Sequence, residues 1–218
     1  MVALEDFIRK VRAKYPDKVL VAGNIVDLHR ALILSDLGVD IVKVGIGGGS
    51  CCLTRLKTGI GRPQLSAIMD CSKANDLYII GDGGITCPGD VVKGFAGGAH
   101  FIMIGGQFAG HDENPGELIT DNDGKRYKIT YGMSSDSAMK KHYGNVAKYR
   151  TSEGRTVKIK YKGCLENTVL DYLGGVRSAC TYLNAYNIKD LPNSTFVRAN
   201  NQLNTCLLYT SPSPRDAT

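Results

Sequence analysis

The sequence contains no long apolar run. Nothing approaches the roughly 18 consecutive apolar residues that a membrane-spanning helix requires, and the first residues lack the apolar centre of a signal peptide. We therefore expect no membrane partner and a cytoplasmic location.

Paired cysteine motifs and dinucleotide fingerprints are also missing. The seven cysteines are an odd number and none forms a CxxC pair, which argues against a disulfide framework or a zinc site and favours the reduced thiols of a cytosolic enzyme. No GxGxxG follows a strand-like run, which argues against a Rossmann cofactor site. The histidines lack metal-ligand partners at useful spacing and are expected at the surface or at helix ends: His29, His100, His111 and His142.

What the chain does contain is typical of a globular protein with one core. Its 218 residues are 43% hydrophobic and 22% charged, and they can bury one sizeable core in a single domain. The net charge is +6, and its densest basic run spans residues 155–162. A basic surface suits a small anionic substrate, while a solvated face without a partner is an equal alternative. No nucleic-acid polymer is expected as a partner.

Apolar runs of strand length alternate with helical patterns in the first half of the chain. Residues 3–15 place apolar side chains at helical spacing. Asp27 is placed to cap a helix, and Pro63 and Pro88 are placed to open two others. The expected order is helix 3–15, strand 19–26, helix 27–37, strand 41–46, helix 63–75, strand 77–80, helix 88–97 and strand 101–104.

Strands that are almost continuously apolar, each followed by a helix, predict an α/β fold with a parallel sheet. Every glycine cluster or polar loop falls at the carboxyl end of such a strand. Both barrels and open α/β sheets place their active sites at that end. An eight-unit barrel needs about 250 residues, and only four strand–helix units can be counted here.

Residues 111–163 break this rhythm. They are polar and far longer than the usual α/β connection of about two to six residues, which indicates a functional insertion or lid. Within them, residues 125–130 and 156–161 are predicted to pair as a two-stranded ribbon, and residues 135–143 to form a short helix capped by serine. Residues 165–183 return to a helical period.

The segment 42–64, VKVGIGGGSCCLTRLKTGIGRPQ, holds the strongest chemical signal. An apolar run ends in glycines, where a backbone without Cβ atoms can approach an ion or a phosphate closely. Two adjacent thiols follow, and the positive charge of Arg55 and Lys57 favours a thiolate. The alternative is a glycine-rich turn that carries two small buried residues.

The same segment resembles the catalytic loop of the inosine monophosphate dehydrogenase and guanosine monophosphate reductase family, whose pattern is GxGSxCxTR followed by GxGxPQ. Cys52 matches the family's thiol. The family usually has proline at the position of Gly48 and a small β-branched residue at the position of Cys51, so both are departures. The other matching residues are Gly47, Gly49, Ser50, Thr54, Arg55, Gly59, Gly61, Pro63 and Gln64.

Because that family uses the (β/α)8 TIM barrel, the resemblance implies that residues 1–205 are the second half of a barrel, with a lid-like insertion at about 111–163 after the last strand. The first four strands would then lie before Met1, which is expected to be an internal methionine. Residues 206–218 resemble a translated sequencing adapter and are excluded from fold reasoning. We expect a C-terminal fragment that is inactive by itself.

Residues 132–139, GMSSDSAM, and 144–157, GNVAKYRTSEGRTV, are closer to the reductase branch of the family than to the dehydrogenase branch. The resemblance therefore implies reduction of GMP to IMP and ammonia by NADPH, through a covalent cysteine thioimidate. The alternatives are an IMP dehydrogenase and a non-catalytic nucleotide-binding α/β module. A homotetramer is implied for the full-length protein.

The resemblance also implies roles for individual residues. Cys52 would be the nucleophile, and Thr54 with Glu153 would protonate the leaving amine, although Glu153 on its own could be an exposed carboxylate. Glycine amides would hold the phosphate, although Gly105 and Gly106 could form a plain tight turn. The expected substrate-binding residues are Ser50, Asp82, Gly83, Gly84, Gly105, Gly106, Gly132, Met133, Ser134, Arg150, Thr151, Ser152 and Gly154.

Two further ligands follow from the same resemblance. The positions expected to bind NADPH are Ile46, Gly47, Met133, Tyr149, Arg150, Ser178, Ala179, Cys180 and Thr181. A potassium ion would be held by the carbonyl groups of Gly47, Gly49 and Cys52 and would lie near Arg55; such rings of carbonyl oxygens suit monovalent cations.

Overall fold

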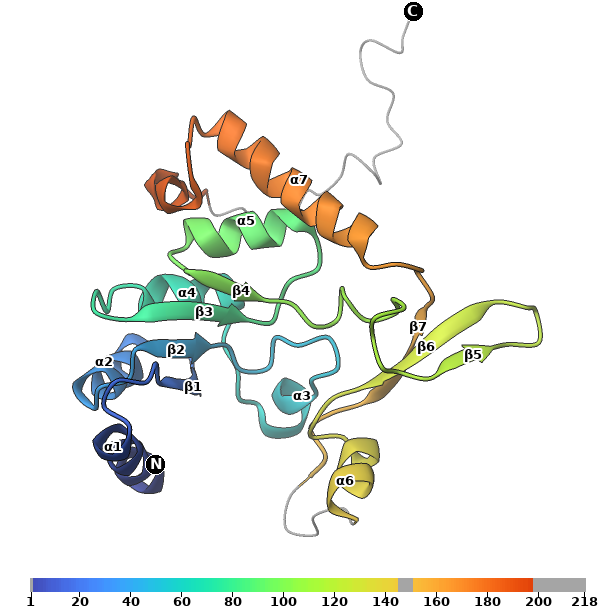
Figure 1. The fold of residues 1–218 in the computed structure, drawn as a ribbon, viewed down its shortest axis with the longest axis horizontal. Helices are drawn as coiled ribbons and strands as arrows, with labels where there is room; N and C mark the ends of the chain where they lie inside the picture. The colour runs from blue at the N-terminus through green and yellow to red at the C-terminus, as the bar shows by residue number, and fades with distance from the viewer. Residues whose placement is uncertain (1, 145–150, 198–218) are drawn as a thin grey trace, which may run out of the picture.

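The computed structural model describes residues 2–144 and 151–197, and shows a mixed α/β fold built on a parallel sheet (Figure 1). The sheet order is β1-β2-β3-β4, formed by Val21–Ile25, Ile41–Val44, Tyr78–Asp82 and Phe101–Met103. Between them lie α2 (Leu28–Asp36), α4 (Gln64–Cys71) and α5 (Pro88–Ala96). The predicted parallel α/β fold and the predicted order of these elements are confirmed.

The strand register sets where the loops begin. Ile25 pairs with Val44, Val44 with Gly81, and Gly81 with Ile102. The carboxyl ends of all four strands therefore lie at one edge of the sheet, and the glycine-rich segments that follow β2, β3 and β4 start side by side.

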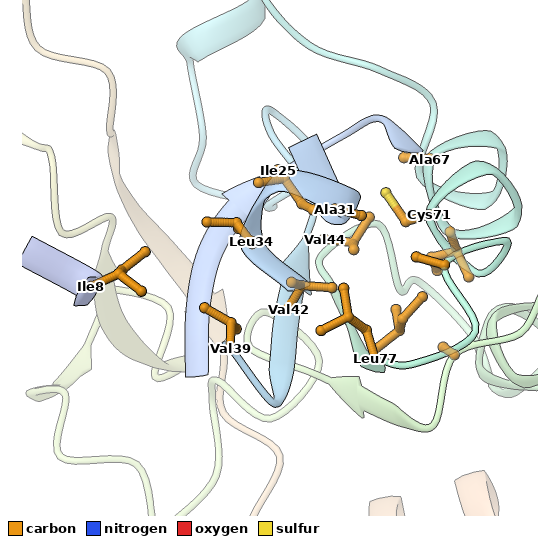
Figure 2. Packing of buried hydrophobic residues seen from close by; sticks show 14 residues of the cluster. Ile8, Ile25, Ala31, Leu34, Val39, Val42, Val44, Ala67, Cys71 and Leu77 are labelled. Atoms are coloured by element: carbon orange, nitrogen blue, oxygen red, sulfur yellow. The ribbon is translucent and has the colours of Figure 1, made fainter. Parts of the chain in front are cut away.

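The core lies between this sheet and the helices (Figure 2). Leu34 on α2, Ile68 on α4, and Val42 and Ile79 on the strands are almost completely buried. Cys71 lies in the same cluster, and burial raises the pKa of its thiol to about 12, so this cysteine is chemically inert. The remaining members of the cluster are Ile8, Ile25, Ala31, Val39, Val44, Ala67, Ala74, Leu77 and Ala99.

The two outer strands, β1 and β4, each pair on one side only within the described part of the chain. Val21 on β1 and Phe101 on β4 are about half exposed, at 47% and 50%. Helix α1 (Val2–Lys14) packs beside β1 and leaves an apolar cavity of about 260 Å³ between them. The sheet described here is therefore open at both edges.

The insertion forms a separate antiparallel sheet that projects from the parallel one (Figure 1). Its strands are β5 (Leu118–Thr120), β6 (Arg126–Tyr131) and β7 (Thr156–Lys160), in that order. The predicted pairing of the two ribbon segments is confirmed by β6 and β7, but the sheet has a third strand, β5, that was not predicted. Leu118–Thr120 pairs with Lys128–Arg126 across a tight turn, in which the Asp121 carboxylate accepts hydrogen bonds from the backbone amides of residues 123 and 125.

The remaining helices match the prediction closely, with three differences. Ser135 caps α6 (Asp136–Tyr143) through its hydroxyl, as expected, and α7 (Glu166–Tyr182) packs along α5. The predicted helix 63–75 ends at Cys71 rather than near residue 75. Two short elements were not predicted: α3 (Thr54–Thr58) and a 3-10 helix, η1 (Ile188–Asn193).

His111 departs from the expected surface position, whereas His29, His100 and His142 are exposed. His111 is 1% exposed, and its ring nitrogens bond the Phe108 carbonyl at 3.0 Å and the Thr168 hydroxyl at 2.8 Å. It joins the start of the insertion to α7, and both ring nitrogens are satisfied, which allows the burial.

The structure also bears on cysteine pairing, metal binding and membrane-spanning helices. The six cysteines of the described ranges are free. No cluster of three or more His, Cys, Asp or Glu side chains in those ranges could hold a metal ion. None of the described helices is long and apolar enough to cross a membrane. The adapter-like residues 206–218 lie outside the described part.

Leu34→Ala should destabilise the fold by about 2–5 kcal/mol, because it leaves a cavity in a closely packed core. Leu32→Ala on the same helix is the matched control, since Leu32 is 46% exposed and its truncation should cost well under about 1 kcal/mol. Urea denaturation followed by circular dichroism compares the two. Equal effects would show that α2 does not pack as described.

Candidate active site

The candidate site lies at the carboxyl edge of the parallel sheet, where the loops after β2, β3 and β4 meet the insertion. A cavity of about 480 Å³ opens there. The loop after β2 is joined to the loop after β3 by a 2.9 Å hydrogen bond from the Gly84 amide to the Gly48 carbonyl. Main-chain groups thus shape much of the wall.

Close backbone approach explains two of the glycines. Gly45 has φ +145°, and a Cβ there would lie 2.1 Å from the Asp82 carbonyl oxygen. A Cβ on Gly106 would lie 2.2 Å from the Ser50 hydroxyl oxygen. Larger residues at either position would force the three loops apart.

The three predicted catalytic side chains form one hydrogen-bonded relay. The Cys52 thiol donates to the Thr54 hydroxyl at 3.1 Å, and that hydroxyl donates to Glu153 Oε2 at 2.6 Å. The second bond is short, as expected when a hydroxyl donates to a carboxylate. All three residues line the cavity, so a proton can pass between the carboxylate and the region of the thiol through one intervening hydroxyl.

Backbone pairing brings Glu153 to the loop. The Leu53 amide donates to the Glu153 carbonyl at 2.6 Å, and Cys52 forms an antiparallel bridge with Gly154. On the other side of this segment, the amides of Glu153 and Gly154 both donate to the Ser134 carbonyl. The segment that carries the carboxylate is therefore held between the loop after β2 and residues 132–135.

Asp82 is held by two residues that the sequence analysis missed. Asn24 Nδ2 donates to Asp82 Oδ2 at 2.9 Å and to the Gly45 carbonyl at 2.6 Å, and Lys43 Nζ lies 3.0 Å from the same Oδ2. These side chains come from β1 and β2; β2 pairs with β3, the strand that ends in Asp82, and β1 pairs with β2 on its other side. Their position as polar residues inside otherwise apolar strands is the sequence feature that could have singled them out, although it does not reveal their contact with Asp82.

The sequence comparisons agree with this geometry. A family model described as "IMP dehydrogenase / GMP reductase domain" matches residues 2–204.

This chain belongs to the IMP dehydrogenase / GMP reductase family.

Among its curated relatives are proteins named GMP reductase. The chain is 54% identical to "GMP reductase 1" of Mus musculus over 206 residues, which cover 92% of this chain and 59% of the mouse protein. It is 55% identical to "GMP reductase" of Vibrio atlanticus over 207 residues, with the same coverage, and 54% identical to that of Caenorhabditis elegans over 205 residues. The chain thus spans less than two thirds of the length of these relatives.

Most positions that the family resemblance assigned to the substrate line the cavity. They are Ser50, Asp82, Gly83, Gly84, Gly105, Gly106, Gly132, Met133, Ser134 and Gly154. Thr151 and Ser152 do not line it; the Ser152 hydroxyl donates instead to the Ser134 carbonyl at 3.1 Å. Arg150 lies outside the described residues.

Other lining residues carried no pattern that separates them from ordinary loop residues. The insertion supplies Asn114, Thr130 and Tyr131, and the strand ends supply the others: Gly48, Cys51, Ile85, Thr86, Met103, Gln107 and Ala109. Lys128, which is 7% exposed, donates to the Asn114 carbonyl at 2.5 Å and so fixes the position of Asn114.

The residues assigned to the potassium site differ in the groups that they can offer to a cation. The Gly47, Gly49 and Cys52 backbone can offer neutral carbonyl oxygens, the donor type that a monovalent ion prefers. The Arg55 guanidinium is a cation that offers no acceptor oxygen. It donates to the Arg62 carbonyl at 2.6 Å, and the Arg55 side chain fills the space beside Gly47. The Arg55 side chain therefore fastens the loop.

The positions assigned to NADPH do not come together in one copy of the chain. Met133 lines the cavity, and Ile46 and Gly47 lie at the end of β2 behind it. The group from Ser178 to Thr181 occupies the last turns of α7, which runs back along α5 away from the insertion (Figure 1). Tyr149 and Arg150 are outside the described residues.

Proposed function

We propose that this chain carries the nucleophile, the acid relay and the nucleotide-binding loops of a GMP reductase, which converts GMP to IMP and ammonia with NADPH. The observation that carries the proposal is the hydrogen-bonded line from Cys52 through Thr54 to Glu153 beside the cavity. The identity of 54–55% to proteins named GMP reductase supports it.

Cys52 is the proposed nucleophile. Its thiolate attacks C2 of the purine and forms a carbon–sulfur bond, which splits a difficult displacement into two easier steps. Ammonia leaves C2 to give a thioimidate. A hydride then adds to C2, the carbon–sulfur bond breaks, and IMP and the free thiolate result.

Thr54 and Glu153 are the proposed acid. The exocyclic amine leaves only if it is protonated, and the protonated carboxyl can deliver a proton through the Thr54 hydroxyl. The 2.6 Å bond between the two groups requires no rearrangement for that transfer. The same path can accept the thiol proton before the attack.

The nucleotide is proposed to bind along the loops at the sheet edge. The amides of Gly105 and Gly106 and the Ser50 hydroxyl would hold the phosphate, and Gly84, whose amide is bonded to the Gly48 carbonyl, would line the same region. Asn24 and Lys43 both bond Asp82 Oδ2, which leaves Oδ1 for the ribose hydroxyls. Residues 132–134, Glu153 and Gly154 would contact the base, and Ser152 would support them through its bond to the Ser134 carbonyl.

NADPH supplies the hydride when it is bound. Met133 and the backbone at Ile46 and Gly47 would face it from this chain, while the α7 positions would serve the site of another copy. We further propose a homotetramer, a cytoplasmic location and a potassium ion at the carbonyls of Gly47, Gly49 and Cys52. The sheet itself is proposed to be half of a (β/α)8 barrel, because open edges at β1 and β4 are what further strands would close.

The chain alone should not oxidise NADPH in the presence of GMP. Its described strands leave two sheet edges unpaired, and open edges favour aggregation over a stable site. A chimera in which residues 2–204 replace the matching segment of the mouse relative should oxidise NADPH and release ammonia in equal amounts, measured by absorbance and an ammonia assay. A folded chimera that binds GMP without turnover would contradict the proposed function.

Cys52→Ala in the chimera should abolish GMP reduction, because it removes the thiol that is bonded to Thr54 and so connected to Glu153. Cys51→Ala is the matched control and should retain most activity, since Cys51 also lines the cavity but does not bond Thr54. Steady-state NADPH oxidation compares the two. Loss only in the Cys51 variant, or equal loss in both, would overturn the assignment.

Glu153→Gln in the chimera should lower kcat by more than about tenfold with little change in GMP binding, because it removes the proton donor and leaves the phosphate loops intact. Glu117→Gln serves as control, since Glu117 is exposed in the same insertion. GMP affinity is measured by calorimetry. A collapse of GMP affinity with a normal chemical step would identify Glu153 as a binding residue instead.

A further inference from the structure

Arg155 holds two consecutive carbonyl groups of the loop that carries the thiols. Its backbone amide donates to the Cys51 carbonyl at 3.0 Å, and its guanidinium Nη2 donates to the Ser50 carbonyl at 2.9 Å. Its own carbonyl accepts a hydrogen bond from the Gly132 amide at 3.1 Å. The residue therefore connects the loop after β2 with the segment that follows β6.

The Arg155 guanidinium donates to a backbone carbonyl rather than to a carboxylate. Among the described residues, no carboxylate lies within ion-pair distance of Arg155. A hydrogen bond from a charged donor to a carbonyl is stronger than one between neutral groups. Ser50 is thus held at both ends, by Arg155 at its carbonyl and by close packing of its hydroxyl against Gly106.

Arg155 and Glu153 stand two positions apart on one extended segment, with Gly154 between them in a bridge to Cys52. Side chains at such spacing point to the same side of a strand. The carboxylate reaches forward to Thr54, and the guanidinium reaches to Ser50, on either side of the thiols in sequence. The two contacts fix the loop backbone from which Cys52 extends.

We propose that Arg155 is a positioning residue that fixes the loop at Ser50 and Cys51 and so keeps Cys52 aligned with Thr54 and Glu153. The consequence for catalysis rests on the proposed reductase function. The fixing of the loop itself does not, because it concerns only contacts within this chain.

The test uses Arg155→Gln, Arg155→Lys and a control, Arg126→Gln. Arg126 is exposed in the same insertion and lies over the Tyr161 ring, away from the thiol loop. Hydrogen exchange of the chimera, read by mass spectrometry, should show faster exchange over residues 50–54 and 153–155 in Arg155→Gln than in the parent chimera. In the chimera, the same variant should lower kcat by about tenfold to a hundredfold while KM for GMP changes by less than about threefold.

Arg155→Lys should recover at least half of the lost kcat, because an ammonium group can still donate to the Ser50 carbonyl. A purely structural role would instead lower thermal stability and raise KM together. Parental exchange and parental kcat in Arg155→Gln, or the same losses in Arg126→Gln, would overturn the inference. If Arg155→Gln shows faster exchange but the parent chimera is inactive, the fixing of the loop is upheld and the reductase function is refuted.

Discussion

The hydrogen bond from Thr54 to Glu153 joins two segments that are 99 residues apart in the chain, and the chemistry proposed for the cavity depends on it. It aligns the thiol, the hydroxyl and the carboxylate in one line. The bond is maintained because the backbone on both sides is already paired, from Leu53 to Glu153 and from Cys52 to Gly154. Side-chain geometry here is a consequence of main-chain pairing between the loop after β2 and the insertion.

The parallel sheet makes that pairing possible. Its register starts the loops after β2, β3 and β4 at one edge, where glycines let their backbones approach closely. The two ends of the insertion are joined to each other at its base, since the Lys162 amide donates to the Gly110 carbonyl and the Asp112 amide to the Gly163 carbonyl, and the Leu53 amide joins the loop after β2 to the insertion at the Glu153 carbonyl. An otherwise projecting antiparallel sheet is thereby anchored beside the cavity. Few ionised side chains line the cavity, so binding of a nucleotide there would depend largely on amide and hydroxyl groups.

Elements with a clear hydrophobic period could be predicted from the sequence. The parallel strands, the helix capped by Ser135 and the pairing of β6 with β7 were confirmed because local patterns determine them. Strand β5 was missed because three residues are too short to show a period. His111 was misjudged because its burial depends on partners at Phe108 and Thr168, which no local pattern reveals.

The residues of the site also divide into those that the sequence could predict and those that it could not. Cys52 and Thr54 stand two residues apart, and the motif names them directly. Glu153 required the family resemblance, since nothing local connects it with the thiol loop. The roles of Asn24, Lys43 and Arg155 follow only from contacts across strands and loops, so three-dimensional geometry was needed to find them.

The account's central claim is that Thr54 and Glu153 act as one unit. The most direct measurement is a double-mutant cycle on kcat of the chimera with Thr54→Val, Glu153→Gln and the combined variant. If the two groups form one relay, the combined variant should be about as slow as the slower single variant, because either change alone interrupts the proton path. Losses that multiply in the combined variant would show that the two residues act independently and would contradict the relay.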